Sequence, residues 1–242
     1  MTSLLFILLA LVCEVLGTLA GFGSSVFFVP LAQFLYSAKV VLGLTALLHV
    51  FSNSSKLFLF RRHIDKRIAL IYGIPSVLLV LLGAWLATRV NTGYESVALG
   101  TFLAVFSMFL LLFPKTTIPA SNTNAIVSGS AAGFFAGFLG TGGAIRGLSM
   151  SAFKLDKNVF VATSAAIDMG VDLSRAVIYV GNDFVSSEYY ILIPFLLLVS
   201  FVGSYLGKEI LSRISQKNFR NFVLICILVI GITTIVKSVF TL

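Results

Sequence analysis

Long apolar runs constrain this chain more than any other feature of its sequence. Leu4 to Leu35 contains one charged residue, Glu14, and Ile68 to Ala87 contains none. A transmembrane helix needs about 20 mainly apolar residues, and several windows of the chain reach that length. Only 11% of the 242 residues are charged, whereas a soluble domain has roughly 25%. The chain cannot cover a water-facing surface, so we expect a single all-α polytopic membrane domain over residues 1–242.

The basic residues lie in short connections between the apolar runs. The formal net charge is +8, and the main basic clusters are 61–67 and 208–220. A nucleic-acid-binding protein gathers such residues on one exposed face, whereas this distribution is typical of cytoplasmic loops. We therefore expect no nucleic-acid partner. Cys13 and Cys226 lie inside apolar runs, which predicts packing and neither a disulfide nor a metal site. No cofactor is expected.

The chain aligns with itself at an ungapped offset of 119 residues. The offset places Gly21 on Gly140, Gly23 on Gly142, Lys56 on Arg175 and Ile74-Pro75 on Ile193-Pro194. One offset that aligns the glycines, the proline and an intramembrane cation together indicates an internal duplication. Repeat 1 is expected over about 1–117 and repeat 2 over about 120–242.

Each repeat contains four apolar segments, at 3–36, 40–60, 68–88 and 94–113, and at 122–153, 157–180, 188–210 and 217–240. The first segment of each repeat is longer than one span and is interrupted by glycines and small polar residues. Glycine inside a helix costs about 1 kcal/mol relative to alanine, so these clusters predict helix breaks. We expect half-helices of about 13 to 18 residues, roughly 20–27 Å long, on either side of each break. Broken helices at corresponding positions of two repeats indicate a transporter binding site.

The loop charges predict that the two repeats are inverted. Loop 61–67 is basic and is expected in the cytoplasm, whereas its repeat mate, 181–188, has two acidic residues and no basic one. Opposite orientations require an odd number of crossings per repeat, so one of the four segments must be re-entrant. We expect two inverted repeats of about 119 residues, each a glycine-broken re-entrant segment plus three transmembrane helices, with both termini outside. Eight full spans are the alternative.

The residues at the two breaks suit an anion. The N–H groups at a half-helix N-terminus carry partial positive charge, glycines let an oxyanion approach the backbone, and hydroxyls add donors. The candidate substrate-binding residues are Gly21, Gly23, Ser24, Ser25, Gly140, Thr141, Gly142 and Gly143. The alternative is that these small residues only allow close helix packing.

The second segment of each repeat carries polar side chains at helical spacing. The two sets are Thr45, His49, Asn53 and Lys56, and Ser164, Asp168, Asp172 and Arg175. Each set forms one stripe of its helix. Because a charge at the bilayer centre costs about 2.5–3.5 kcal/mol, both stripes are expected to face the bundle interior.

These charged residues have candidate roles and alternatives. Lys56, Arg175 and Arg146, just beyond the second break, are candidate counter-charges for an anion, with Asn53 and Asp172 beside them. His49 and Asp168 are candidates for proton coupling. The alternatives are that Lys56 and Arg175 extend to the membrane interface, that Asp172 and Arg175 neutralise each other, and that His49 is structural. Glu14 is either a cavity carboxylate or the partner of a buried cation.

The segment LAGFGSSVFFVPL, Leu19 to Leu31, resembles the signature of the TauE/SafE sulfite exporter family, G-x-G-G-G followed five residues later by proline and leucine. Gly21, Gly23, Pro30 and Leu31 match it, while Ser24 and Ser25 replace two glycines. The second copy, Phe138 to Met150, has Gly140, Gly142 and Gly143, but Ala144 and Ser149 replace the last glycine and the proline. The resemblance implies a multi-pass transporter of the bacterial inner membrane for sulfite, sulfonates and related organic anions.

The expected function is secondary transport of a small anion, such as sulfite or a sulfonate, by alternating access around the two broken helices. An anion channel is the first alternative. A membrane-embedded enzyme is the second, but the two histidines are fourteen residues apart and neither H-E-x-x-H nor G-x-S-x-G occurs. We therefore expect no enzyme. The expected partners are the anion and the lipid bilayer, and a homo-oligomer is left open.

Overall fold

The computed structural model describes residues 2–20, 23–90, 92–116, 118–211 and 216–241, and the described residues are helical with no strand. The first half contains α1 (Thr2–Ala20), α2 (Ser25–Ala32), α3 (Ala38–Phe60), α4 (Lys66–Arg89) and α5 (Thr92–Leu112). The second half contains α6 (Asn122–Leu139), α7 (Gly143–Ser151), α8 (Lys157–Gly181), the 3₁₀ helix η1 (Ser187–Leu192), α9 (Ile193–Leu211) and α10 (Gln216–Thr241).

The helices occupy the positions that the apolar segments predict, but the arms of the two broken segments are unequal. The first arms, α1 and α6, have 19 and 18 residues, while the second arms, α2 and α7, have only 8 and 9. The expected length of about 13 to 18 residues fits the first arms to within one residue, but it was wrong for the second arms, which are much shorter. At 1.5 Å per residue, α2 and α7 are only about 12–14 Å long, much shorter than a bilayer core.

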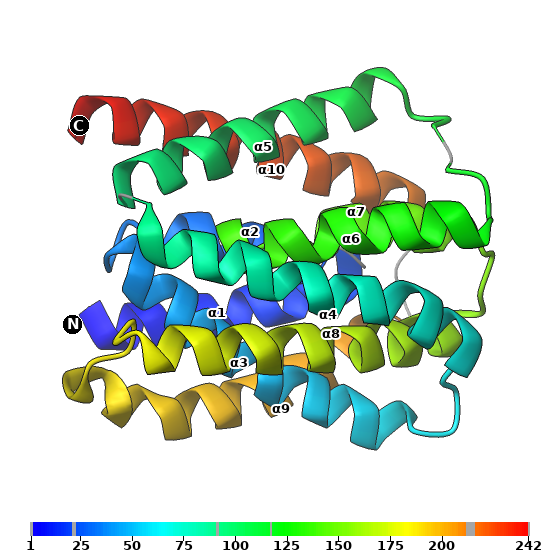
Figure 1. The fold of residues 1–242 in the computed structure, drawn as a ribbon, viewed down its shortest axis with the longest axis horizontal. Coiled ribbons are helices and arrows are strands. Elements are labelled where there is room, and N and C mark those ends of the chain that lie inside the picture. Colours follow the sequence, from blue (N-terminus) through cyan, green and yellow to red (C-terminus); the bar gives the residue numbers. More distant parts are fainter. Residues whose placement is uncertain (1, 21–22, 91, 117, 212–215, 242) are drawn as a thin grey trace.

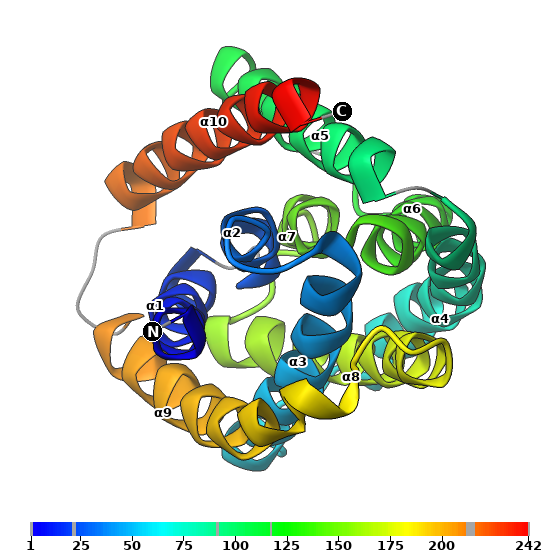
Figure 2. The same ribbon diagram turned by 90° about the vertical axis from the view of Figure 1, so that its left-hand side faces the viewer.

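The helices lie side by side along the long axis of the molecule (Figure 1). Both termini lie at one end, together with the connection between α8 and η1, and the connection between α3 and α4 lies at the opposite end. Viewed along the helices, α2 and α7 lie next to each other in the interior, while α5 and α10 cross on one side of the molecule (Figure 2).

The second half repeats the order of the first. Adding 119 to the bounds of α1, Thr2–Ala20, gives 121–139, and α6 spans Asn122–Leu139. The same shift carries α3, Ala38–Phe60, to 157–179, and α8 spans Lys157–Gly181. The packing follows this correspondence, because α1 contacts α9 as α6 contacts α4, and α3 contacts its counterpart α8.

Glycines bring α6 against α4. A Cβ atom on any of three glycines spaced by four residues would collide with the α4 backbone; these are Gly129, Gly133 and Gly137. Such a stripe of small residues lets two membrane helices approach closely. The glycines of α6 therefore serve helix packing along most of its length.

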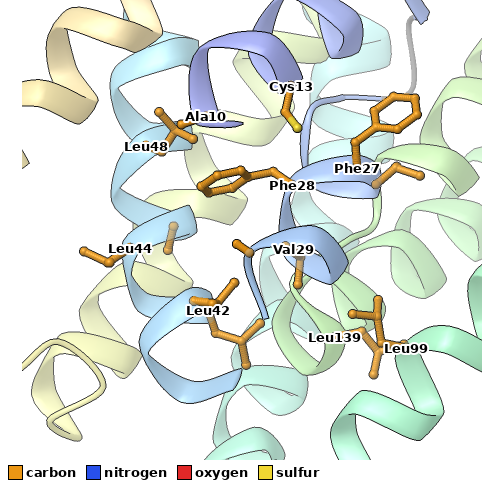
Figure 3. Close-up of a cluster of buried hydrophobic side chains, with 14 of the residues drawn as sticks. Ala10, Cys13, Phe27, Phe28, Val29, Leu42, Leu44, Leu48, Leu99 and Leu139 are labelled. Carbon is orange, nitrogen blue, oxygen red and sulfur yellow. The ribbon is translucent and has the colours of Figure 1, made fainter. Parts of the chain in front are cut away.

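The short helix α2 is held in a hydrophobic cluster (Figure 3). Phe28 and Val29 of α2 are fully buried among side chains of α1, α3, α5 and α6, which include Ala10, Cys13, Leu42, Leu44, Leu48, Leu99 and Leu139. Inside a bilayer such close van der Waals packing, rather than the exclusion of water, holds helices together. The core therefore fixes where the N-terminus of α2 points.

The outer surface is apolar. Along α4, large apolar side chains that are at least 40% exposed recur about one turn apart, at Leu70, Ile74, Leu78, Leu81 and Trp85. The described residues contain five helices long and apolar enough to cross a membrane, within Thr2–Leu19, Ala38–Phe60, Lys66–Arg89, Tyr94–Leu112 and Ser187–Ile210. The protein is therefore a multi-spanning membrane protein, and its exposed apolar side chains face lipid.

Candidate functional site

Each broken segment contains a glycine with a backbone conformation that other residues rarely adopt. Gly23, just before α2, has φ +81°, and Gly140, which ends α6, has φ +77°. A side chain is disfavoured at such a φ. The two glycines therefore allow a sharp bend of the backbone between the arms of each broken segment.

The N-termini of α2 and α7 come together in the interior. Ser25 Oγ, in the first turn of α2, donates to Thr141 Oγ1 at 3.3 Å. A Cβ atom on Gly23 would lie 4.0 Å from the Cα of Gly143, the first residue of α7. The N–H groups of two helix N-termini, one from each half, thus face the same small space, and both carry partial positive charge.

A polar cavity of about 40 Å³ lies between the two breaks. Its lining includes most of the predicted site residues, namely Gly23, Ser24, Ser25, His49, Asn53, Lys56, Gly140, Gly142, Gly143, Arg146, Asp168, Asp172 and Arg175. Thr141 is fully buried just behind this lining, where it accepts the bond from Ser25. Gly21, also predicted, lies outside the described residues.

Two ion pairs of the second half line the cavity. Arg175 Nε and Nη2 lie 2.8 and 2.7 Å from Asp172 Oδ1, and Asn53 Nδ2 donates to Asp172 Oδ2 at 2.7 Å. Arg146 pairs with Asp168 through Nη1, while its buried Nε has no hydrogen-bond partner among the residues that the structure describes. Both pairs are charge-assisted hydrogen bonds. Arg146 is the more available of the two arginines for a ligand, because part of its guanidinium is unpaired.

Arg175 also donates hydrogen bonds to the C-terminal end of α6. Its Nη1 donates to the carbonyl oxygens of Ala136 at 3.2 Å and Gly140 at 3.1 Å. The last carbonyls of a helix lack partners within the helix and need donors of this kind.

The Arg175 side chain is 1% exposed, so it does not extend to the membrane interface. The Lys56 side chain, 16% exposed, likewise turns inward to the cavity.

The first half contributes a carboxylate, Glu14, that is fully buried. Glu14 Oε1 accepts from Ser24 Oγ at 2.5 Å, and Oε2 accepts from Ser52 Oγ at 2.7 Å. Lys56 Nζ lies 3.7 Å from Oε2 and donates to Ser52 Oγ at 2.8 Å. Of the two roles that the sequence left open for Glu14, the structure favours the partner of a buried cation.

His49 joins the two halves of this network. Its Nδ1 lies 2.9 Å from Arg175 Nη2, and its Nε2 lies 2.8 Å from Ser24 Oγ. A guanidinium has donors and no acceptor, so Nδ1 must accept and carries no proton. A neutral imidazole with this tautomer donates its Nε2–H to Ser24.

Comparison with known proteins assigns this architecture to a family. The family named sulfite exporter TauE/SafE matches residues 5–234. The chain belongs to the TauE/SafE family. A TauE/SafE protein is a transporter rather than an enzyme. A relative from Bacillus subtilis (strain 168), called "Probable membrane transporter protein YunE", is 24% identical over 277 aligned positions that cover 100% of both chains. No solved structure matches the chain.

The sequence missed several polar members of this TauE/SafE cavity. Ser52 and Tyr72 line it, and Ser204 of α9 lies 3.2 Å from Ser52 Oγ. Ser52 could have been found, since it lies three residues after His49 on the same helical stripe. Tyr72 and Ser204 lie in mainly apolar segments, each with one serine a turn away (Ser76 and Ser200), and neither was predicted as a site residue.

Proposed function

We propose that this TauE/SafE protein moves a small sulfur oxyanion, with sulfite as the reference substrate, across the bacterial inner membrane. The observation that carries the proposal is the convergence of the α2 and α7 N-termini on a buried polar cavity that contains a partly unpaired arginine, Arg146. Helix N-termini and guanidinium groups are the donors that oxyanions prefer. Gly23 and Gly143 leave the backbone N–H groups open to an oxygen at close range.

The size of the cavity favours a small substrate. A cavity of about 40 Å³ holds roughly three waters, because one water needs about 10–15 Å³ on this measure. Sulfite, with four heavy atoms, is comparable to that volume. A larger organosulfonate requires the cavity to expand. We therefore rank sulfite above the larger sulfonates and organic anions.

We also propose that the two halves are inverted repeats, about 1–117 and about 120–242, that rock against each other in an alternating-access cycle. The hydrogen bond between Asn53 and Asp172 joins two residues that are 119 positions apart. A residue that contacts its own repeat mate lies near the axis that relates the repeats. The α3–α4 and α8–η1 connections, which are repeat mates, lie at opposite ends of the molecule, and this supports inversion (Figure 1). Transporters built from inverted repeats typically bind substrate at the interface between the repeats.

The broken segments are proposed to be re-entrant hairpins. Helix α2 is too short to complete a crossing, and it packs back against α1. A Cβ atom on Gly17 of α1 would collide with the backbone of Ser24, and one on Gly142 would collide with the carbonyl of Ala132. Glycines thus allow the two arms of each hairpin to approach closely. This arrangement favours three spans and one hairpin per repeat over eight full spans.

The test is uptake of labelled sulfite into proteoliposomes that contain the purified protein. A carrier shows saturation and is accelerated by unlabelled sulfite on the opposite side, whereas a channel shows neither. Gly23→Ala should abolish uptake, because the new methyl group faces the cavity 3.8 Å from Arg146 Nη2 and is strained at φ +81°. The matched control is Gly181→Ala, where a Cβ meets no atom within 4 Å. Wild-type uptake no faster than in empty vesicles contradicts the proposed function.

A further inference from the structure

The charges around the cavity balance one another. Among the described residues its cations are Lys56, Arg146 and Arg175, and each has a carboxylate within 4 Å, namely Glu14, Asp168 and Asp172 in that order. The N–H groups of the two helix N-termini serve as hydrogen-bond donors to the anion, but each break also places a C-terminal end of opposite partial charge beside them, so the helix ends add no net charge. A monovalent anion would therefore bring one uncompensated charge into a buried site, which is costly. A single positive charge that enters with the anion removes that cost.

The hydrogen bonds of the first half run in one direction, toward Glu14. Arg175 Nη2 donates to His49 Nδ1, His49 Nε2–H donates to Ser24 Oγ, and the Ser24 hydroxyl donates to Glu14 Oε1. Each donor is fixed by its neighbour, since the guanidinium cannot accept and the carboxylate cannot donate. These four groups form a continuous path from the cavity to a fully buried carboxylate.

We propose, on the basis of the proposed sulfite transport, that the anion crosses together with one proton and that Glu14 binds this proton, which reaches it through His49 and Ser24. When Arg175 Nη2 turns to the anion, His49 Nδ1 is free to accept a proton from hydronium. The Nε2 proton then passes to Ser24 Oγ, and the hydroxyl proton of Ser24 passes to Glu14 Oε1. Three bonds to hydrogen break and three form, and His49 is again neutral with its proton on the other nitrogen.

The protonation of Glu14 frees a counter-charge for the anion. Lys56 Nζ lies 3.7 Å from Glu14 Oε2 and lines the cavity. A neutral Glu14 no longer compensates Lys56, so the anion becomes its partner and the site stays neutral. Among the described residues, the charged or titratable groups that face Glu14 are Lys56 and His49 on α3 and Cys13 beside it on α1. The other groups near it are hydroxyls: Ser24 and Ser52 donate to Glu14, and Ser204 of α9 contacts Ser52.

The groups that face His49 come from four helices. They are Glu14 on α1, Lys56 on its own helix α3, Arg146 on α7, and Asp172 and Arg175 on α8. The aspartates of α8 are the competing proton acceptors. Both are already bonded to an arginine, and Glu14 alone terminates the directed path. We therefore place the proton on Glu14.

The experiment measures protons and sulfite together in proteoliposomes that contain a trapped pH-sensitive dye. Sulfite has its own proton equilibrium, so the quantity compared is the number of protons moved per sulfite in two proteins under identical conditions. The wild type should move one more proton per sulfite than Glu14→Gln, and the ratio is taken per sulfite so that a variant with slower sulfite flux can still be compared. Equal ratios overturn the inference. Absence of saturable sulfite flux in the wild type instead overturns the proposed function.

Two matched measurements complete the test. Glu95→Gln, a buried carboxylate on α5 outside the cavity lining, should keep the wild-type ratio. If Glu14→Gln does not fold, Ser24→Ala interrupts the same path and should lower the ratio. Infrared difference spectra of the wild type should show a new protonated carboxylic acid on addition of sulfite. No such band, or a band that persists in Glu14→Gln, overturns the assignment.

Discussion

Arg175 holds more of this structure together than its predicted role as a counter-charge implies. It pairs with Asp172, contacts His49, and donates to the carbonyls of Ala136 and Gly140. Arg175→Met would leave Asp172 as a buried charge without its cation. Removal of one partner of a buried ion pair costs about 3–5 kcal/mol. We therefore expect this variant to lose stability as well as transport.

A second substitution separates the charge from the packing. In Arg175→Met/Asp172→Asn the buried charge is gone, and Asn53 can still donate to the side-chain oxygen at position 172. The double variant should recover more than half of the lost stability, because most of the cost in the single variant comes from the unpaired carboxylate. Additive losses in the two single variants would contradict this account.

A thiol-reactive fluorescent maleimide gives the readout, since Cys13 is 1% exposed and reacts only when the core opens. Cys226, which is partly exposed, is replaced with Ser in every protein. At about 2–4 °C per kcal/mol, Arg175→Met should lower the melting temperature by on the order of 10 °C. The control Arg89→Met, an exposed arginine over Trp85, should change it little. An unchanged melting temperature in Arg175→Met refutes the reasoning.

Three further predictions follow from the site and the topology. Lys56→Met should weaken sulfite binding by about 10- to 150-fold, the loss of a charged hydrogen bond worth about 1.5–3 kcal/mol; equal affinities by calorimetry would exclude Lys56 from the site. From the outer face, a membrane-impermeant thiol reagent should label Ser187→Cys but not His63→Cys, and equal labelling would remove the case for inversion. Gly133→Val should reduce the yield of folded protein, measured by size-exclusion chromatography, because its Cβ would collide with the Ser76 backbone; a normal yield would contradict the packing role.

The sequence was sufficient to locate the helices. Apolar runs of membrane-spanning length indicated where the long helices lie, and the two glycine clusters indicated where two of the segments break, because few other structures satisfy the backbone inside a bilayer. The same constraint located most of the cavity. A charged side chain such as Asp168 or Arg175 cannot face lipid at low cost, so a polar stripe on an apolar helix had to face inward.

The pairing of the charges could not be predicted in the same way. Asp172 lies within one helical turn of Arg175, but the pairing of Arg146 with Asp168 depends on how α7 docks beside α8. The bonds from Ser24 and Ser52 to Glu14 span 10 and 38 residues. Contacts of this kind arise from tertiary packing, which helical periodicity does not encode. The unequal hairpin arms were missed for a related reason, since the glycine cluster marks a break but not where the second arm ends.

Positions that are equivalent in the two proposed repeats differ in chemistry. The offset of 119 pairs Glu14 with Gly133, Ser24 with Gly143, His49 with Asp168, and Lys56 with Arg175. The second half retains the cation but has glycines where the first half has the carboxylate and the hydroxyl of the directed path. Two identical halves would provide two similar half-sites for the anion. A separate proton acceptor in one half requires the two halves to have different side chains at equivalent positions. In the proposed cycle the first half supplies the proton site and the second half supplies the rigid ion pairs. The two proposed repeats are therefore not interchangeable, because only the first can change its charge without disrupting an arginine pair.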